Sequence, residues 1–323
     1  MTTGLNVGII GVGRHGARYV NHILHDVDGL TLAAVSRRAS VGQEQAAAWG
    51  ARFFPDWRDL VRAPEVEAVI GVTTPDLNEA IGRACVAAGK PLLLEKPLAV
   101  DGAAADRLVA LFAAAGLPLT VGQTLRYNGV IRALRRELPR LGQVYSFTAS
   151  QRLEPTLHDW LDDPQVAGGG VILHSAVHLF DALRFITGHE VARVRASMFS
   201  RKNQNVEDLV TAQLEMSNGL VGVMDASKVG AGRSGHYAFV GEHGLLQGDQ
   251  VHDRLQLVAG MAVQDLAHEA VGPAIAPLLK DWLAHLQGQG PNPVPGAEGL
   301  AAVRICDACR RAALEDGWVR VEV

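Results

Sequence analysis

The stretch Asn6-Val-Gly-Ile-Ile-Gly-Val-Gly-Arg-His-Gly16 decides the fold of this chain. Its first five residues are of the kind that form a buried parallel strand. Gly11, Gly13 and Gly16 then follow in GxGxxG spacing, which allows a tight turn, a close backbone approach to a pyrophosphate and close packing of a helix on the sheet. The pattern predicts a dinucleotide-binding turn at a helix N-terminus, and a purely structural glycine-rich turn is the alternative.

The rest of the first 120 residues alternates between apolar strands and helices. We expect strands at residues 6–10, 30–36, 66–73, 91–95 and 118–122. We expect helices at residues 14–27, 43–49, 78–88 and 101–115. Strands rich in Val, Ile and Leu, separated by helices, favour an α/β fold with a parallel sheet covered on both faces.

The second half has a different pattern. We expect strands at residues 144–152, 192–200, 210–216, 220–226, 236–241 and 256–259, one long helix at 171–186, and a final helix and short strand. Ser217-Asn218-Gly219 is a strong hairpin signal. We therefore predict an N-terminal Rossmann domain at residues 1–121 and a C-terminal α+β domain with an open, mostly antiparallel sheet at residues 122–323.

Composition excludes several classes of protein. The 323 residues are enough for about two domains, and 48% apolar with 20% charged residues is unlike a disordered or coiled-coil chain. The net charge of −4 shows no basic excess, so we expect no nucleic-acid partner. Met1 to Val7 lacks a signal-peptide pattern, and the apolar run 108–121 is broken by Gly116 and Pro118, so we expect a cytoplasmic protein without a membrane partner.

The three cysteines are Cys85, Cys306 and Cys309. The last two form a CxxC within a helical pattern, without the second ligand pair of a zinc site and without the strand-to-helix position of a redox site. We expect buried, reduced helix cysteines and no metal.

Cofactor choice depends on the end of the second predicted strand. An NAD site typically has Asp or Glu there, whereas this chain has Ser36-Arg37-Arg38. A hydroxyl and two guanidinium groups would attract a 2′-phosphate. The sequence therefore predicts NADP, with NAD possible, and a solvated arginine face is the alternative.

Further motifs follow in a fixed order along the chain: Thr73-Thr74-Pro75, Glu95-Lys96-Pro97, Gln123 to Asn128, and Gly168-Gly-Gly followed by His174, His178 and Asp181. Together they resemble the glucose–fructose oxidoreductase / inositol dehydrogenase (Gfo/Idh/MocA) family of NAD(P)-dependent oxidoreductases, over nearly the full chain. The resemblance implies a Rossmann domain followed by an open-sheet domain that often forms the oligomer interface. We accordingly expect a homodimer or homotetramer.

Lys96 is the first catalytic candidate. It follows a buried parallel strand and so lies at the carboxyl edge of the sheet, where α/β folds bind ligands. The resemblance gives the lysine of Glu-Lys-Pro the role of bonding the reacting oxygen, whose developing negative charge its ammonium would stabilise. A lysine facing solvent is the alternative.

His178 and His174 are the other catalytic candidates. On an α-helix, both lie within about 60° of Asp181, which predicts a polar stripe along a cleft wall. The resemblance makes His178 the general acid/base, a role that suits imidazole near neutral pH. The family commonly has Asp where this chain has His174, so His174 could instead bind a substrate hydroxyl or carboxylate.

The remaining expected contacts follow the same motifs. Expected cofactor-binding residues are Gly11, Val12, Gly13, Arg14, His15, Gly16, Ser36, Arg37, Arg38, Thr73, Thr74, Pro75, Asn78, Glu95, Lys96 and Gln123. Asn78 stands where the family often has His, and a local packing role is its alternative. Expected substrate-binding residues are Lys96, Arg126, Tyr127, Asn128, His158, Asp159, Trp160, His174 and His178. For His158 and Asp159, a surface loop is the alternative.

These features predict an NADP-dependent oxidoreductase that moves hydride between nicotinamide and a sugar, cyclitol or related polyhydroxy or keto compound. Three alternatives stay open. One is a redox-assisted lyase or glycoside-cleaving enzyme that retains its cofactor, and another is a non-catalytic NADP-binding regulator. The third is metal chemistry at the His174/His178 pair, for which the sequence offers no third ligand. Substrate and reaction direction stay open.

Overall fold

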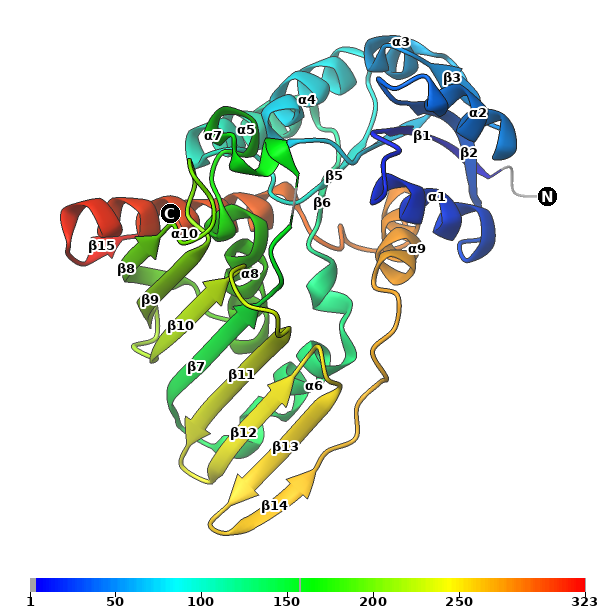
Figure 1. The fold of residues 1–323 in the computed structure, drawn as a ribbon. Coiled ribbons are helices and arrows are strands. Elements are labelled where there is room, and N and C mark those ends of the chain that lie inside the picture. Colours follow the sequence, from blue (N-terminus) through cyan, green and yellow to red (C-terminus); the bar gives the residue numbers. More distant parts are fainter. Residues whose placement is uncertain (1–3, 157, 323) are drawn as a thin grey trace. The chain divides into compact units, whose positions relative to one another are not determined.

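The computed structural model describes residues 4–156 and 158–322. The chain forms two compact units (Figure 1). The first contains the residues up to Ala99, Ala103–Thr124 and Pro273–Leu300, and the second contains Val100–Gly102, Leu125–Gly272 and the residues from Ala301 onward. The sequence-based boundary between residues 121 and 122 stays a proposal, and it differs from this division mainly in the place of residues 273–300.

The first unit is built on a six-stranded parallel sheet with strand order β3-β2-β1-β4-β5-β6. The strands are β1 Leu5–Ile10, β2 Leu30–Ser36, β3 Arg52–Phe54, β4 Ala68–Gly71, β5 Leu92–Glu95 and β6 Leu119–Gly122. Every residue of β4, β5 and β6 is buried, as in a sheet covered on both faces. The order reverses between β1 and β4, where open α/β sheets bind their ligands. The predicted Rossmann fold is confirmed.

Six helices belong to this part of the fold: α1 Gly16–His25, α2 Val41–Ala48, α3 Trp57–Arg62, α4 Asn78–Ala87, α5 Gly102–Ala115 and α9 Ile275–Leu286. The sequence analysis missed α3, α9 and the short strand β3. Asp56 begins α3 by accepting a hydrogen bond from the Arg58 backbone N at 2.9 Å. α9 packs on α1, and its buried Leu279 and Trp282 explain why residues 273–300 group with the first unit.

The second unit contains a nine-stranded sheet with order β14-β13-β12-β11-β7-β10-β9-β8-β15. Its strands are β7 Val144–Arg152, β8 Val191–Phe199, β9 Leu209–Met216, β10 Val221–Ser227, β11 Ser234–Gly241, β12 Gly244–Asp249, β13 Arg254–Ala259, β14 Ala262–Asp265 and β15 Val319–Arg320. Only β7 and β10 pair in parallel within the described residues, so the mostly antiparallel prediction is confirmed. The sequence analysis missed β12 and the wholly exposed β14.

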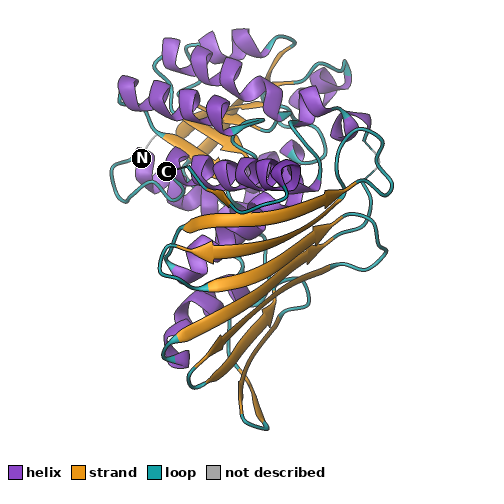
Figure 2. Cartoon of the chain, turned by 90° about the vertical axis from the view of Figure 1, so that its left-hand side faces the viewer, coloured by secondary structure: helices purple, strands orange, loops and turns teal. Residues whose placement is uncertain are grey.

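One face of this sheet is packed and the other is open. The helices assigned to this part are α6 Gly129–Glu137, α7 Pro164–Ala167, α8 Val177–Thr187 and α10 Gly296–Glu315. α6 and α8 contact strands of the sheet, and Figure 2 shows the strands in front of helices. On the open face, Val221 and Val223 are about half exposed. Sheets of this kind commonly have one face in the core and one in solvent.

Among the described residues, one helical stretch, Pro164–Thr187, is long and apolar enough to cross a membrane. Most of this stretch is buried inside the protein, as in the core helix of a globular domain. Cys85, Cys306 and Cys309 are buried free thiols, as predicted. Burial raises the pKa of the Cys85 thiol to about 12, so this side chain is packed and unreactive.

Candidate active site

The turn after β1 has the backbone that a pyrophosphate site requires. Gly11 has φ +93°, and a Cβ on it would lie 2.1 Å from the Val72 carbonyl oxygen. A Cβ on Gly16 would lie 2.2 Å from the Gly11 oxygen. At Gly13, by contrast, a Cβ would meet no atom within 4 Å. Two glycines are therefore needed for packing, whereas Gly13 keeps the backbone open to a ligand at the start of α1.

The end of β2 is bonded to this turn. The Gly11 backbone N donates to the Ser36 oxygen at 2.9 Å. Arg37 Nη1 donates to the Val12 oxygen at 3.4 Å and to Gln45 Oε1 at 2.8 Å. Arg38 is exposed and Ser36 is buried. The strand thus ends in a hydroxyl and two guanidinium groups beside the turn, with no carboxylate among these three residues.

Lys96 follows β5 directly, at the carboxyl edge of the parallel sheet. It is partly buried, and its peptide bond to Pro97 is cis. Burial lowers the pKa of the Lys96 ammonium, and the charge of Glu95 opposes that effect. Lys96 therefore lies in a poorly solvated place, where a hydrogen bond from its ammonium form to a developing oxyanion is strong.

Glu95 is buried and joins β5 to α1. Its Oε1 accepts hydrogen bonds from the Tyr19 hydroxyl at 2.5 Å and from His15 Nε2 at 2.8 Å. Its Oε2 accepts the Lys96 backbone N–H at 3.0 Å. Burial by itself would raise the pKa of Glu95, but the hydrogen bond and charge of His15, the charge of Lys96 and the Tyr19 bond outweigh it, so the pKa is lowered.

The structure thus brings together three residues that the sequence analysis placed in the cofactor site, His15, Glu95 and Lys96. It also adds Tyr19, which the sequence analysis missed. The available signal was the i, i+4 spacing of His15 and Tyr19, which puts both on one side of α1. Burial raises the pKa of the Tyr19 hydroxyl well above its ordinary range, so it serves Glu95 as a neutral donor.

Asn78 holds the turn that follows Lys96. Its Nδ2 donates to the Pro97 and Leu98 carbonyl oxygens, each at 3.1 Å, and its Oδ1 accepts from Thr73 Oγ1 at 3.3 Å. The side chain is 2% exposed. These contacts support the packing alternative for Asn78, and a direct cofactor contact stays a prediction. Thr74 and Pro75 begin the 3-10 turn before α4, and buried Gln123 follows β6.

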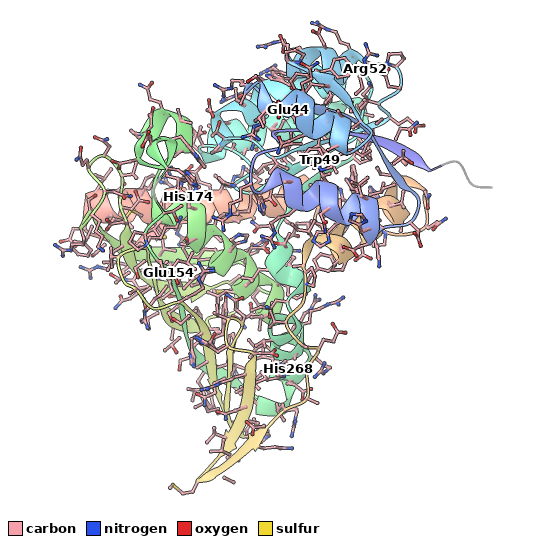
Figure 3. The ribbon with its side chains drawn as sticks, turned by 45° about the vertical axis from the view of Figure 1, so that its right-hand side comes forward. Glu44, Trp49, Arg52, Glu154, His174 and His268 are labelled. Atoms are coloured by element: carbon pink, nitrogen blue, oxygen red, sulfur yellow. The ribbon has the colours of Figure 1, made fainter. Side chains whose placement is uncertain are left out.

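In the second unit, the predicted helix at residues 171–186 is confirmed, but it is not α-helical throughout. Residues Ile172–Ala176 form a π-helical turn, and α8 begins only at Val177. The angular spacing of an α-helix therefore does not apply between His174 and His178. Both imidazoles are partly buried, and the His174 ring lies edge-on to Trp160 with 5.5 Å between centroids (His174 is labelled in Figure 3). The structure thus brings His174 and Trp160 together.

Asp181 does not continue the polar stripe that the sequence predicts along His174 and His178. Its side chain is fully buried and accepts two bonds from Arg126, from Nη2 at 2.6 Å and from Nε at 2.8 Å. The interpretation of Asp181 as part of a cleft wall is therefore wrong: it is a buried partner of Arg126. Removing either Arg126 or Asp181 would leave the other charge buried without its partner, which strongly destabilises a folded protein.

Of the other predicted substrate-binding residues, Asn128 and Tyr127 contact other residues of the protein, whereas His158, Asp159 and Trp160 are exposed. Asn128 caps α6: its Oδ1 accepts from the Val130 and Ile131 backbone N–H groups, and its Nδ2 donates to the Gln250 oxygen at 3.1 Å. Tyr127 lies under the Arg132 guanidinium. His158 and Asp159 are exposed, as is Trp160 at 37%. Substrate binding by these residues stays a prediction, and for Asn128 the structure supplies a capping role instead.

The described residues contain no group of three or more His, Cys, Asp or Glu side chains placed to hold a metal ion. The fit to a dinucleotide rests instead on the open backbone at Gly13 and on the uncapped start of α1, where His15 makes no side-chain capping bond. These features match a phosphate-binding helix terminus.

Comparisons with known proteins agree with this fold. A family model described as "Oxidoreductase family, NAD-binding Rossmann fold" matches residues 5–123, and a "GFO/IDH/MocA C-terminal domain" model matches residues 136–247. Inositol 2-dehydrogenase 2 of Saccharopolyspora erythraea is 31% identical over 99% of this chain and 96% of its own. 1,5-Anhydro-D-fructose reductase of Ensifer adhaerens is 30% identical over 66% of each chain.

Among solved structures, levoglucosan dehydrogenase in complex with NADH and levoglucosan superposes with a TM-score of 0.89. It covers 99% of this chain and 100% of its own, at 21% identity. Aldose-aldose oxidoreductase from Caulobacter crescentus, complexed with glycerol, also has a TM-score of 0.89, at 20% identity. At these identities the likeness establishes the shared fold.

Proposed function

The chain belongs to the Gfo/Idh/MocA family of oxidoreductases, and we propose that it is an NADP-dependent oxidoreductase acting on a sugar, cyclitol or related polyhydroxy compound. The observation that carries this proposal is the hydrogen-bonded link between the phosphate turn and Lys96. His15 of that turn donates to Glu95, and Glu95 accepts the backbone N–H of Lys96. A dinucleotide on the turn and a cation for the reacting oxygen are thereby parts of one local structure.

The residues divide the work as follows. Bound nicotinamide supplies the hydride acceptor or donor. Lys96 donates a hydrogen bond to the substrate oxygen and stabilises negative charge on it. His178 takes or returns the hydroxyl proton as general acid/base. His174 and the Trp160 ring against it contact the substrate, because an aromatic face and a polar rim suit a polyhydroxy ring.

A substrate screen tests this function. The purified protein is incubated with inositols, hexoses, anhydrosugars and their keto forms, and absorbance at the reduced-nicotinamide band is followed with NADP(H) and NAD(H). We expect turnover with at least one cyclic polyol or its ketone. Substrate consumption without net absorbance change, with nucleotide copurifying, would instead identify an enzyme that retains its cofactor. Binding of nucleotide without any turnover would contradict the proposed activity.

The preference for NADP rests on the end of β2. Arg37 is held near the turn by Val12 and Gln45, and exposed Arg38 is next to it. No carboxylate at the end of this strand would repel a 2′-phosphate, and both guanidinium groups would attract it.

We expect NADPH to bind at least about tenfold more tightly than NADH, and Arg38→Asp to remove most of that difference, since one charge-assisted contact is worth about 1.5–3 kcal/mol. Fluorescence titration of reduced nucleotide measures both affinities. Arg62→Asp, at an exposed position on α3, is the matched control and leaves the ratio unchanged. Tighter NADH binding by the unaltered protein would reverse the assignment.

We also propose a homodimer or homotetramer assembled on the open face of the nine-stranded sheet. Val221, Val223 and Val240 are each about 45–48% exposed there, and strand register puts all three on the same side. A hollow of about 740 Å³ on this face is lined by polar side chains such as Thr148, Gln213 and His236. The free buried thiols suit the cytoplasmic location that we propose for the protein.

A further inference from the structure

We propose that His15 is a positioning residue for Lys96, acting through Glu95. In this arrangement His15 keeps the Glu95 carboxylate ionised, and the carboxylate holds the lysine beside the phosphate turn. The consequence for turnover rests on the proposed function, whereas the effect on Glu95 does not. Nothing in the GxGxxG pattern requires a histidine at this place, because only the three glycines have backbone roles.

The geometry of His15 is the first argument. His15 stands at the start of α1 with its side chain 46% exposed, yet it makes no capping bond to the helix. Its Nε2 is directed across to strand β5 and lies 2.8 Å from Glu95 Oε1. Its ring is edge-on to Tyr19, with centroids 5.7 Å apart. The imidazole is thus held from two sides against the carboxylate, and not against the phosphate-binding amides.

The second argument is the balance of charge around Glu95. His15 and Tyr19 face it from the N-cap and first turn of α1, and Lys96 follows it directly after the end of β5. Arg18 acts on Tyr19 from the same helix. On the neighbouring strand β6, the residue opposite is Gly122, which has no charge and whose missing Cβ leaves room for the carboxylate. Among the described residues, therefore, few donors oppose the desolvation of this carboxylate, and His15 is the most exposed of them.

Removing the His15 donor has a definite direction. Burial then acts on Glu95 with less opposition, so its pKa rises and the acid form persists to higher pH. A neutral Glu95 no longer supplies the charge that offsets the desolvation of Lys96. The pKa of Lys96 then falls further, because burial acts on it without the opposing charge of Glu95. The acid limb of turnover should consequently move to higher pH.

The experiment compares His15→Leu, which removes the donor, with His15→Gln, which retains an N–H that can reach the carboxylate. His25→Leu, at the exposed end of the same helix, is the matched control. Carboxyl ¹³C NMR of glutamate-labelled, nucleotide-free protein follows the Glu95 titration, with Glu95→Gln identifying its signal. Steady-state kinetics across pH give kcat and the KM for NADPH.

In His15→Leu we expect the Glu95 titration to rise by about one pH unit or more, a tenfold change in its ionisation equilibrium. The acid limb of kcat shifts with it, while the KM for NADPH changes little. His25→Leu keeps the original profile, and His15→Gln, which keeps an N–H donor but not the charge of an imidazole, shifts the Glu95 titration less than His15→Leu does. Tyr19→Phe, which removes the other Oε1 donor, shifts the titration in the same direction.

An unchanged Glu95 titration in His15→Leu overturns the inference. So does a rise in the KM for NADPH without movement of the acid limb, because that result makes His15 a phosphate ligand. If the unaltered protein shows no turnover with any polyol, the proposed function fails, and the NMR titration still decides whether His15 controls Glu95.

Discussion

At the scale of single residues, Lys96 is the centre of the proposed chemistry. Burial lowers the pKa of its ammonium, and the adjacent Glu95 carboxylate opposes that shift. A cation kept in a poorly solvated place interacts strongly with a developing alkoxide, because little water screens the pair. We therefore expect that a neutral side chain of similar length cannot replace the lysine.

Lys96→Met tests that role. We expect kcat to fall by roughly 10²–10³-fold, the usual cost of removing one oxyanion donor. The affinity for NADPH should stay within about threefold, since the glycine turn is untouched. Steady-state kinetics and nucleotide titration measure the two quantities, and Lys280→Met on the exposed side of α9 is the control. Retained turnover would remove Lys96 from the mechanism.

At the scale of secondary structure, one carboxylate links two helices of the first unit. Glu79 on α4 accepts from Arg83 of the same helix at 2.7 Å and from Arg107 of α5 at 2.8 Å. Hydrogen bonds from Arg107 and then Arg83 lower the pKa of Glu79 to about 2. Both arginines are more than half exposed, so solvent screens much of this interaction.

The sign of the resulting pH dependence follows from the lowered pKa. The Glu79 ion pairs contribute stability above the ordinary pKa of 4.5 and lose it as pH falls toward about 2. After allowance for screening, Glu79→Gln should destabilise the protein by about 1 kcal/mol at pH 7. Denaturant unfolding at pH 7 and at pH 3 measures this difference, which should shrink at the lower pH. Glu44→Gln, at an exposed position on α2, should cost little stability at either pH, and an equal loss there would contradict the assignment.

The π-helical turn at Ile172–Ala176 could not be predicted from the local sequence pattern. Periodicity favours an ordinary helix there, but Glu207, far along the chain, binds its start. The Val171 N–H donates to the Glu207 carbonyl oxygen at 2.8 Å, and the Ile172 N–H donates to Glu207 Oε1 at 3.0 Å. A Cβ on Gly170 would lie 1.7 Å from the same carbonyl oxygen, so the glycine is needed for this approach.

At the scale of the whole molecule, the open face of the nine-stranded sheet carries the proposed assembly. Val223→Glu puts a charge into its centre, and desolvating that charge would oppose association. We expect sedimentation velocity to show a shift toward monomer, with little change in thermal stability because Val223 is already 48% exposed. Leu314→Glu, 88% exposed on α10, is the control. An unchanged oligomer in Val223→Glu would exclude this face as the interface.

The sequence alone determined the features that depend on neighbours along the chain. Apolar runs between helices specified the parallel sheet, the glycine spacing specified the phosphate turn, and alternation with hairpin signals specified most of the second sheet. The signals failed for short or exposed elements such as β3, α3 and β14, and the sequence analysis also missed the helices α6 and α9.

Only the tertiary structure decided how distant residues share charge and hydrogen bonds. His15 binds Glu95, and Asp181 is the buried partner of Arg126. α9 belongs to the first unit although it follows the second sheet in the sequence. In each case the residues are separated by dozens of positions. Local periodicity can indicate which face of an element is polar, but the partner that satisfies a buried charge comes from whichever element packs against it.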